Sequence, residues 1–422
     1  MSQQAFDVLV IGAGPAGLAA ASSAASSGVR VGLIDDNPSA GGQIWRGGLE
    51  HAPTSQATLW LIRANADAIT LFARTRVISR VQPGVLLVET PTGAQELSFR
   101  QLILASGARE LFLPFPGWTL PGVMGAGGLQ ALVKGGLPIA GKRVVVAGSG
   151  PLLIAVAAYL KSRGARVQCI VEQTSWSKLG HFGLQLARSP SKLRQARSLG
   201  WRLRGVPLHA NSWITRADGS ERLEAVSIQR GKRVETLSCD YLACGFGLVP
   251  NIELGSALGC TIEHGTLQVD EWQQTNSAGI FCAGEVTGIG GLDLALLEGQ
   301  IAGLAASGQT AAARVLFSAR AREQRFACHL ASSFALHAEL KRLAEPETLV
   351  CRCEDVPYQA LQEHTNWRAA RLQTRCGMGP CQGRVCGSAT AFLFGRTPDS
   401  VRPPVTVARV ASLVSTHSDQ EK

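Results

Sequence analysis

Residues 6–17 read FDVLVIGAGPAG, an apolar run followed by glycines in the spacing GxGxxG. A short apolar, β-branched run of this kind predicts a buried parallel strand, and the glycines predict a tight turn into a helix. The alanine-rich residues 18–27 fit that helix, and a second apolar run at residues 29–34 fits the next strand. The sequence therefore predicts a βαβ unit and an α/β fold that begins with a nucleotide-binding domain.

Each part of this motif has a physical role in binding a dinucleotide. Gly12 permits the tight turn, Gly14 lets the backbone approach a pyrophosphate, and Gly17 lets the helix pack close to the strand. The N-terminus of the helix then directs partial positive charge at the phosphates. Asp35 ends the second strand, where a carboxylate can accept from a ribose 2′-hydroxyl and disfavours a 2′-phosphate. FAD or NAD therefore fits this site better than NADP.

The pattern is repeated at residues 143–172, with Gly148-Ser149-Gly150 at the turn and Glu172 at the end of the second strand. Leu153 stands in the place of the third glycine, and a side chain there changes how helix and strand pack. A second nucleotide fold is predicted, with Glu172 on a ribose. Two possibilities stay open: the site binds a second nucleotide (NAD or ATP), or it is a relic that binds nothing.

Two further stretches bear on the choice between FAD and NAD. Residues 275–285, TNSAGIFCAGE, resemble the second FAD motif of two-dinucleotide-binding-domain flavoproteins. In that motif a short strand ends in Ala-Gly-Asp, and the acid contacts the ribityl and phosphate region of the flavin; here Glu285 replaces the Asp. Residues 102–108 and 242–247 resemble the two crossovers that enclose an inserted domain in the same superfamily. The resemblance implies FAD at the front site.

The candidate cofactor-binding residues follow from these motifs. In the front site they are Gly12, Gly14, Pro15, Ala16, Gly17, Asp35, Gly42, Gln43, Ala105, Gly107, Gly284 and Glu285. In the second site they are Gly148, Gly150 and Glu172.

The cysteines are concentrated near the end of the chain. Five of the eleven lie within residues 351–386, and the other six are scattered among apolar neighbours, where we expect small core residues. Four thiolates can hold a two-iron two-sulfur cluster, and glycines beside them let backbone N–H groups turn toward sulfur and tune its potential. Zinc is the main alternative, although the usual Cys-x2-Cys knuckles are absent; an empty, degenerate module is another. Beside a flavin domain, a cluster is favoured.

Length and composition limit the other function classes. The 422 residues allow two or three domains, and no apolar run predicts a membrane span or a signal peptide. We therefore expect a cytoplasmic protein with reduced thiols, with peripheral association at the inner membrane left open. The net charge is +10, and no acid occurs between residues 172 and 218. That basic stretch indicates a solvated surface, an anionic ligand or an acidic partner, but no nucleic-acid module accompanies it.

Four segments carry a family resemblance. Residues 41–46 (GGQIWR), 116–123 (PGWTLPGV) and 148–153 (GSGPLL), together with the cysteine module, resemble the FAD- and iron–sulfur-binding subunits of multi-subunit amino-acid dehydrogenases. That group includes the opine oxidase A subunit, the alpha subunits of proline and hydroxyproline dehydrogenases, and the hydrogen cyanide synthase B subunit. The C-terminal module is similar to bacterioferritin-associated ferredoxin. This similarity implies a ligand set that leaves Cys376 outside and consists of Cys351, Cys353, Cys381 and Cys386.

The resemblance also implies a division of labour between subunits. The substrate is oxidised mainly in a second flavoprotein, the beta subunit, and this chain relays the electrons through FAD and the cluster to an acceptor such as a quinone. Some members hold FMN at a subunit interface, and a small third subunit is a further partner to consider. The expected substrate is an opine, D-hydroxyproline, proline or a sarcosine-like amine. No acid–base pair is recognised in the sequence, so no catalytic residue is predicted.

Three alternatives to this function are kept. They are a glycine dehydrogenase subunit of the hydrogen cyanide synthase type, a self-sufficient NADH-dependent ferredoxin-type reductase, and a structural scaffold whose nucleotide sites are merely occupied. Disulfide reduction is not expected, because neither residues 41–46 nor residues 130–150 hold a cysteine. The expected domain order is FAD domain, first part (1–115), inserted nucleotide-fold domain (116–243), FAD domain, second part (244–315), helical linker (316–345), cluster module (346–397) and tail (398–422).

Overall fold

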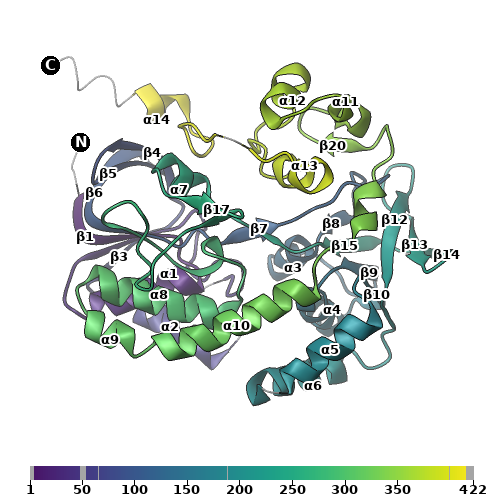
Figure 1. The fold of residues 1–422 in the computed structure, drawn as a ribbon, viewed down its shortest axis with the longest axis horizontal. Coiled ribbons are helices and arrows are strands. Elements are labelled where there is room, and N and C mark those ends of the chain that lie inside the picture. Colours follow the sequence, from purple (N-terminus) through teal and green to yellow (C-terminus); the bar gives the residue numbers. More distant parts are fainter. Residues whose placement is uncertain (1–3, 48–53, 65, 188, 399, 415–422) are drawn as a thin grey trace. The chain divides into compact units, whose positions relative to one another are not determined.

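The computed structural model describes residues 4–47, 54–64, 66–187, 189–398 and 400–414 (Figure 1). Within these residues the chain divides into two units, each assembled from separate segments. Unit 1 draws on residues 1–109, 249–328 and 400–422, and unit 2 on residues 110–248 and 329–399. The cysteine module thus belongs to the same unit as the inserted nucleotide fold.

Unit 1 is built on a seven-stranded sheet whose centre is parallel. The first strand, β1 (Gln4–Ile11), pairs in parallel with β2 (Val31–Ile34) and with β6 (Gly93–Leu104). Beyond them, β3 (Ile69–Phe72) pairs with β2, and β19 (Ile280–Cys282) pairs with the end of β6. The apolar residues of β1 are buried, as the sequence predicts for a parallel strand covered on both faces.

The sheet of unit 1 is extended by an antiparallel hairpin. It consists of β4 (Arg76–Gln82) and β5 (Val85–Thr90), and β5 pairs with the first half of β6. The end of the chain lies along this hairpin, where the Val405 N–H donates to the Ile78 carbonyl at 2.8 Å. The described part of the expected tail therefore packs against its own unit.

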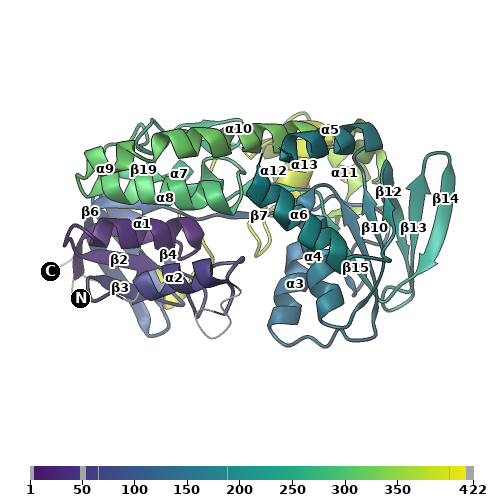
Figure 2. The same cartoon turned by 90° about the horizontal axis from the view of Figure 1, so that it is seen from below.

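Two helices of unit 1 lie side by side (Figure 2). They are α1 (Pro15–Ala25) and α8 (Leu292–Ala306). A Cβ atom at Gly299 would lie 2.2 Å from the Ala16 carbonyl oxygen, so only glycine permits this approach. The remaining elements are α2 (Ser55–Arg63), α7 (Glu253–Ala257), β17 (Ile262–Glu263), β18 (Thr266–Leu267), the 3-10 turn η2 (Gly284–Val286) and α9 (Thr310–Arg314).

Three elements carry the chain from one unit to the other. They are β7 (Ala108–Glu110), β16 (Leu248–Pro250) and α10 (Phe317–Ser333).

None of the helices in the described part of the chain combines the length and the apolar character that a membrane crossing requires.

Unit 2 contains a parallel sheet in the order β11-β10-β9-β15-β8. Its strands are β8 (Val123–Gly125), β9 (Arg143–Gly148), β10 (Arg166–Glu172), β11 (Leu208–His209) and β15 (Tyr241–Gly245). Its helices are α3 (Ala126–Lys134), α4 (Pro151–Ser162), α5 (Trp176–Leu186) and α6 (Pro190–Arg202). A separate antiparallel sheet is formed by β12 (Ser212–Asp218), β13 (Ala225–Arg230) and β14 (Arg233–Ser238).

Two sequence expectations about unit 2 can be compared with this fold. Leu153 is fully buried in the core between α4 and the sheet, so the fold accommodates a side chain where a third glycine would stand. Helix α6 has no buried residue among those described, and it carries several side chains of the basic stretch. That arrangement fits the solvated surface that the sequence indicated.

The cysteine module is small and has its own core. It contains β20 (Leu349–Cys351), β21 (Val356–Pro357), α11 (Tyr358–Gln362), α12 (Trp367–Thr374) and α13 (Cys386–Phe394). The 3-10 helix η3 (Ala338–Arg342) precedes the module, and its Leu340 packs in the core of the inserted domain. Val350, Leu361 and Trp367 form its apolar centre together with three of the cysteines.

Candidate flavin and cysteine sites

The turn between β1 and α1 has a geometry that requires glycine. Gly12 adopts a φ of +103°, and a Cβ there would lie 2.3 Å from the Ala105 carbonyl oxygen. A Cβ at Gly17 would lie 1.7 Å from the Gly12 carbonyl oxygen. At Gly14, by contrast, the nearest atom is 4.0 Å away, at the Cα of Gly42. The N-terminus of α1, which begins at Pro15, is therefore open to an anion such as a pyrophosphate.

The Asp35 carboxylate anchors this turn and keeps one hydrogen-bond acceptor position for a ligand. Its Oδ2 accepts the Ala13 N–H at 2.6 Å, and its Oδ1 accepts the backbone and side-chain N–H groups of Asn37, both at 2.7 Å. A carboxylate offers about four acceptor positions, so one position is left. That is compatible with a hydrogen bond from a ribose hydroxyl, the role predicted for Asp35.

The second FAD-like segment lies between α1 and α8. Gly284 has a φ of +80°, and a Cβ there would lie 2.7 Å from the Cβ of Ala16. The Oε1 of Glu285 accepts the Gly291 N–H at 2.9 Å, whereas its Oε2 is buried without a hydrogen-bond partner among the described residues. Burial raises the pKa of Glu285. A buried carboxylate oxygen without a partner, beside the N-termini of two helices, is a position that a flavin hydroxyl would complete.

Residues 41–46 form a turn against the phosphate loop. The Gly41 N–H donates to the Ala13 carbonyl at 2.7 Å, and a Cβ at Gly42 would lie 2.9 Å from the Gly14 Cα. In the same turn the Arg46 Nη2 donates to the Gln43 Oε1 at 2.6 Å, while the Arg46 Nε is buried without a partner among the described residues. An unsatisfied guanidinium N–H in this turn fits an anionic ligand.

The first crossover is held from the second part of the domain. Ala105 is buried beside Gly12, and the Gly107 carbonyl accepts the Asn251 N–H at 2.9 Å. Asn251 also donates from its side chain to the Ser106 carbonyl at 2.8 Å. All twelve candidate residues of the front site lie in unit 1.

Sequence reasoning did not single out Glu298, which is buried in α8. Its Oε2 accepts the Gly284 N–H and the Thr287 hydroxyl, both at 2.9 Å. Burial raises the pKa of this carboxyl to about 7. Glu298 therefore holds the turn that carries Glu285. In the sequence, the feature that could have indicated this role is an acidic residue inside a mostly apolar helical stretch.

The second nucleotide-like turn, in unit 2, is engaged by the chain itself. Residues 334–337, here named the strap, connect α10 to η3. The Ser149 hydroxyl donates to the Phe334 carbonyl at 3.0 Å, and the Phe334 ring packs edge-on against Phe182 at 5.0 Å between ring centroids. The Gln173 side chain donates to the Ala335 carbonyl at 3.3 Å and accepts the His337 N–H at 2.9 Å.

Glu172 lies beneath this turn, in the position that Asp35 has in the front site. It is buried, and it accepts the Gly150 N–H at 2.7 Å and the Thr174 N–H at 2.8 Å. Burial raises the pKa of its carboxyl, against these hydrogen bonds. The predicted second site thus has the expected fold, with the strap hydrogen-bonded at the position next to its glycine turn.

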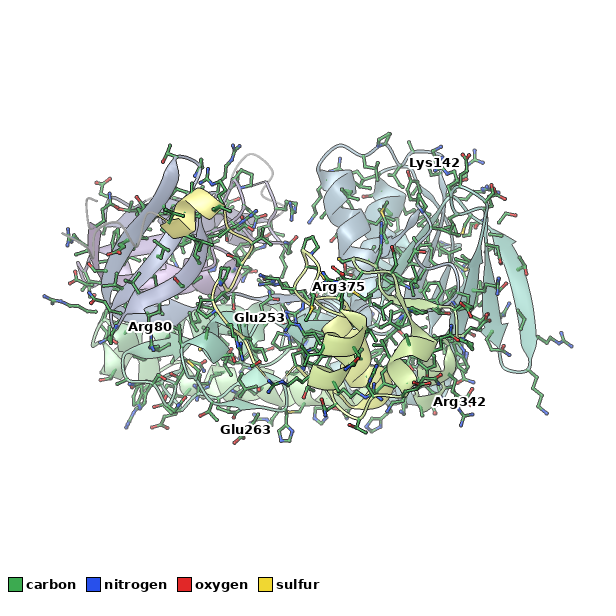
Figure 3. All side chains as sticks on the ribbon, turned by 90° about the horizontal axis from the view of Figure 1, so that it is seen from above. Arg80, Lys142, Glu253, Glu263, Arg342 and Arg375 are labelled. Carbon is green, nitrogen blue, oxygen red and sulfur yellow. The ribbon has the colours of Figure 1, made fainter. Side chains whose placement is uncertain are left out.

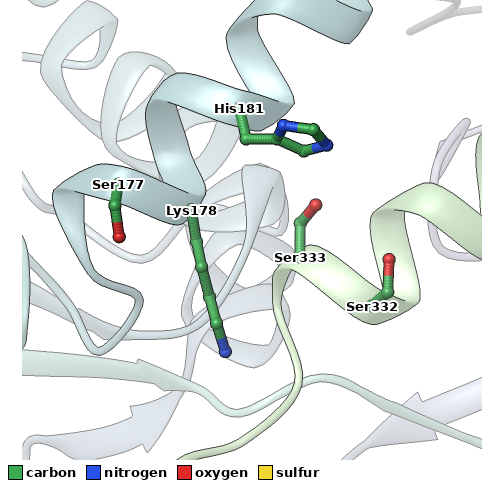
Figure 4. A pocket seen from close by; sticks show the side chains of 5 residues that line it. All are labelled: Ser177, Lys178, His181, Ser332 and Ser333. Carbon is green, nitrogen blue, oxygen red and sulfur yellow. The ribbon is translucent and has the colours of Figure 1, made fainter.

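A polar cavity of about 260 Å³ lies beside the start of the strap (Figure 4). Ser177, Lys178 and His181 line it from α5, and Ser332 and Ser333 line it from the end of α10. The His181 ring also contacts the Gln185 side chain at 2.9 Å. Apart from Ser333, which is half-buried, the residues that line this cavity are exposed, and Lys178 belongs to the basic stretch that the sequence singled out.

The cysteine module brings three thiols together. The sulfur atoms of Cys351, Cys376 and Cys386 all lie within 4.8 Å of one another, and all three residues are buried. The neighbouring thiols of Cys376 and Cys386 lower the pKa of Cys351. The other two predicted ligands, Cys353 and Cys381, contact each other. A buried set of thiols is the donor set that iron–sulfur clusters or zinc take.

Charged groups near these thiols are partly paired. Arg375, labelled in Figure 3, follows α12 and binds the Glu354 carboxylate at 2.7 Å.

Outside the module, the cysteines expected to be core residues can be compared with the structure. Five of them are buried as expected: Cys169, Cys239, Cys244, Cys260 and Cys282. The expectation was wrong for Cys328, which is exposed. It lies on α10, a helix in which none of the described residues is buried.

Comparisons with known proteins agree with this architecture. The chain matches the family described as pyridine nucleotide-disulphide oxidoreductase over residues 6–311. It is 32% identical to the opine oxidase A subunit of Rhizobium meliloti (strain 1021), over 97% of this chain and 99% of that protein. It is 31% identical to hydrogen cyanide synthase subunit HcnB of Pseudomonas aeruginosa, over 90% of each. Its fold resembles that of L-proline dehydrogenase from P. horikoshii, with a TM-score of 0.74 at 19% identity, over 98% of this chain and 80% of that one.

The predicted fold class and family resemblance are confirmed by these matches. The match to the family spans both parts of the FAD domain and the domain inserted between them, and both named sequence relatives are subunits of larger enzymes. The chain therefore belongs to the pyridine nucleotide-disulphide oxidoreductase family and is an FAD-dependent oxidoreductase.

Proposed function

We propose that this chain is the electron-relaying alpha subunit of a multi-subunit dehydrogenase that oxidises an amino acid or a secondary amine. The observation that carries the proposal is the likeness to the opine oxidase A subunit along nearly the whole length of both chains. The substrate class proposed is an opine, D-hydroxyproline, proline or a sarcosine-like amine. A second flavoprotein subunit would hold the substrate site.

The front site supports FAD through the groups that this chain supplies. The open N-terminus of α1 would receive the pyrophosphate, Asp35 the ribose, and the unpartnered Oε2 of Glu285 a hydroxyl of the flavin's ribityl chain. FAD supplies the exchange between two-electron and one-electron chemistry. Oxidation of an amine to an imine releases two electrons, which therefore have to leave this subunit one at a time if a cluster is the next carrier.

The cysteine module supports a two-iron two-sulfur cluster. We propose Cys351, Cys353, Cys381 and Cys386 as its ligands. Cys351 and Cys386 lie in the buried group of thiols, whose third member is Cys376, and Cys353 and Cys381 contact each other. Such a cluster passes single electrons, and a quinone is the proposed acceptor. FMN at a subunit interface and a small third subunit belong to the proposal as further components, and the complex is proposed to work in the cytoplasm or at the inner-membrane surface.

Two alternatives are weighed by particular observations. A glycine dehydrogenase subunit of the hydrogen cyanide synthase type is supported by the 31% identity to subunit HcnB over 90% of the chain. A self-sufficient NADH-dependent reductase is disfavoured by the strap, which hydrogen-bonds Ser149 and Gln173 beside the second glycine turn. The same contacts favour a second nucleotide fold that holds neither NAD nor ATP.

The test is anaerobic purification of the full chain, followed by assay of FAD, iron and acid-labile sulfide. We expect bound FAD and about two irons and two sulfides per chain. The chain is then co-expressed with the proposed beta subunit. Dye reduction by the purified complex is measured with opines, D-hydroxyproline, proline, sarcosine and glycine. Activity that needs both subunits supports the proposal. Bleaching of the flavin by NADH with this chain alone would overturn it in favour of the reductase.

A further inference from the structure

Helices α5 and α6 of unit 2 carry large side chains that the fold leaves in water. Trp176 and Leu184 on α5 are 61% and 74% exposed, and Trp201 on α6 is 78% exposed. The two helices follow each other in the chain and contact each other (Figure 2). The surface is here named the α5–α6 face, and it consists of Trp176, Gly180, Gly183 and Leu184 on α5 and Arg194, Arg197 and Trp201 on α6.

We propose that the α5–α6 face docks this protein on the surface of an anionic phospholipid bilayer. The occupant of the face is the lipid headgroup region, which receives the two tryptophan rings beside the arginines. This inference adds a docking surface to the proposed function. It does not depend on the proposed cluster or on a second subunit, because no candidate ligand or cofactor residue lies on α5 or α6.

The side of α5 that faces water is apolar. Its four residues in the face stand at i, i+4, i+7 and i+8, the spacing that gathers residues on one side of a helix. A Cβ at Gly180 or at Gly183 would meet nothing within 4 Å, so the described chain leaves this side uncovered there. The buried Phe182 lies on the other side of the helix and packs edge-on against Phe334. Helix α5 is therefore apolar toward the core and apolar again toward water.

The exposed side of α6 combines a tryptophan with positive charge. Arg194, Arg197 and Trp201 stand at i, i+3 and i+7, again on one side of the helix. Among the described residues no carboxylate forms an ion pair with either arginine. No acid occurs between residues 172 and 218. The positive charge of the face is therefore left for a partner outside the chain.

The combination favours a lipid surface over an acidic protein. Tryptophan and leucine beside basic residues are typical of helices that lie in the membrane interface, with the rings at the level of the headgroups. Anionic lipids attract such basic residues within about a Debye length of the surface. Protein partners fix their register with complementary charges, and this face offers one sign only. A bilayer of uniform negative charge needs no register.

The charge is tested by co-sedimentation of the purified full chain with vesicles of equal parts phosphatidylglycerol and phosphatidylcholine. The wild type should sediment with them and far less with phosphatidylcholine alone. The double variant Arg194→Gln, Arg197→Gln should have a partition constant lower by about fivefold for each arginine removed. The matched control is Lys232→Gln with Arg233→Gln, two exposed basic residues elsewhere in unit 2, and it should match the wild type.

The rings are tested in the same assay. Trp176→Ala with Trp201→Ala should lower the partition constant about tenfold or more, because two large side chains no longer enter the lipid. Val234→Ala is the control, since Val234 is 60% exposed in the same unit and lies outside the face. Brominated phosphatidylcholine in the vesicles should quench tryptophan fluorescence of the wild type. This quenching should disappear in Trp176→Phe with Trp201→Phe, which keeps the aromatic rings.

The inference is overturned if the wild type stays in solution with the anionic vesicles, or if both double variants sediment as it does. Quenching that persists without the two tryptophans also overturns it. If the wild type ignores vesicles and the variants instead lose a co-expressed beta subunit, the face binds a protein and the inference is wrong. Flavin, iron and sulfide are assayed in the same samples, and their absence from the wild type would count against the proposed function and not against this face.

Discussion

The buried carboxyl of Glu298 makes the stability of unit 1 depend on pH in a defined direction. Its pKa is about 7 in the folded chain, against 4.5 for an exposed glutamate. Because the folded value is raised, the contribution of this group is fully present below pH 4.5 and is lost as the pH rises through 7. Each pKa unit corresponds to 1.36 kcal/mol, so the free energy of unfolding should fall by about 2 kcal/mol between pH 5.5 and 8.

Glu298→Gln should remove this dependence, because an uncharged amide can still accept from the Gly284 N–H and the Thr287 hydroxyl. We expect the stability advantage of the variant over the wild type to be larger at pH 8 than at pH 5.5 by about 2 kcal/mol. Glu263→Gln is the control, since Glu263 is an exposed residue of the same unit; Figure 3 labels it.

The measurement is urea unfolding of the full chain at both pH values, followed by release of flavin fluorescence, which reports on unit 1. The decisive quantity is the difference between the pH dependence of the wild type and that of Glu298→Gln. Equal pH dependence in the two chains would show that Glu298 is ionised in the folded protein, and it would refute the reasoning from burial.

Three further predictions concern the nucleotide sites. Gly17→Ala should abolish bound FAD, because its Cβ would lie 1.7 Å from the Gly12 carbonyl oxygen; flavin content checks this, with Gly180→Ala, a helical site with open space, as control. Glu285→Ala should weaken FAD binding about tenfold or more, since a buried acceptor is removed; unchanged affinity in a fluorescence titration would contradict it. Calorimetry of the full chain with NADH should give no saturable binding because the strap is hydrogen-bonded beside the second turn, and micromolar binding would count against that account.

The sequence allowed the front site to be predicted because its signals are local. The spacing of Gly12, Gly14 and Gly17 and the acid after the next strand fix one strand–turn–helix geometry, and the structure has it. The Ala-Gly-Glu segment was found by resemblance, and its contact with α1 follows from packing that residues 283–285 alone do not specify.

What was missed depends on contacts between distant parts of the chain. The strap occurs in a stretch that the sequence predicts as a helical linker, and its role depends on Ser149 and Gln173, more than 160 positions away. The approach of Cys376 to Cys351 depends on a turn held against Trp367. Spacing patterns describe neighbours along the chain, so they carry no signal for either arrangement.

The end of the chain has a consequence for how this protein is handled. Strand β4 is the last strand of its sheet, and its outer side receives the Val405 N–H and the Thr406 hydroxyl. An uncovered outermost strand is a template onto which another polypeptide can add. Truncating the chain before residue 400 would uncover the outer side of β4 and favour self-association. Affinity tags are therefore best attached after residue 414.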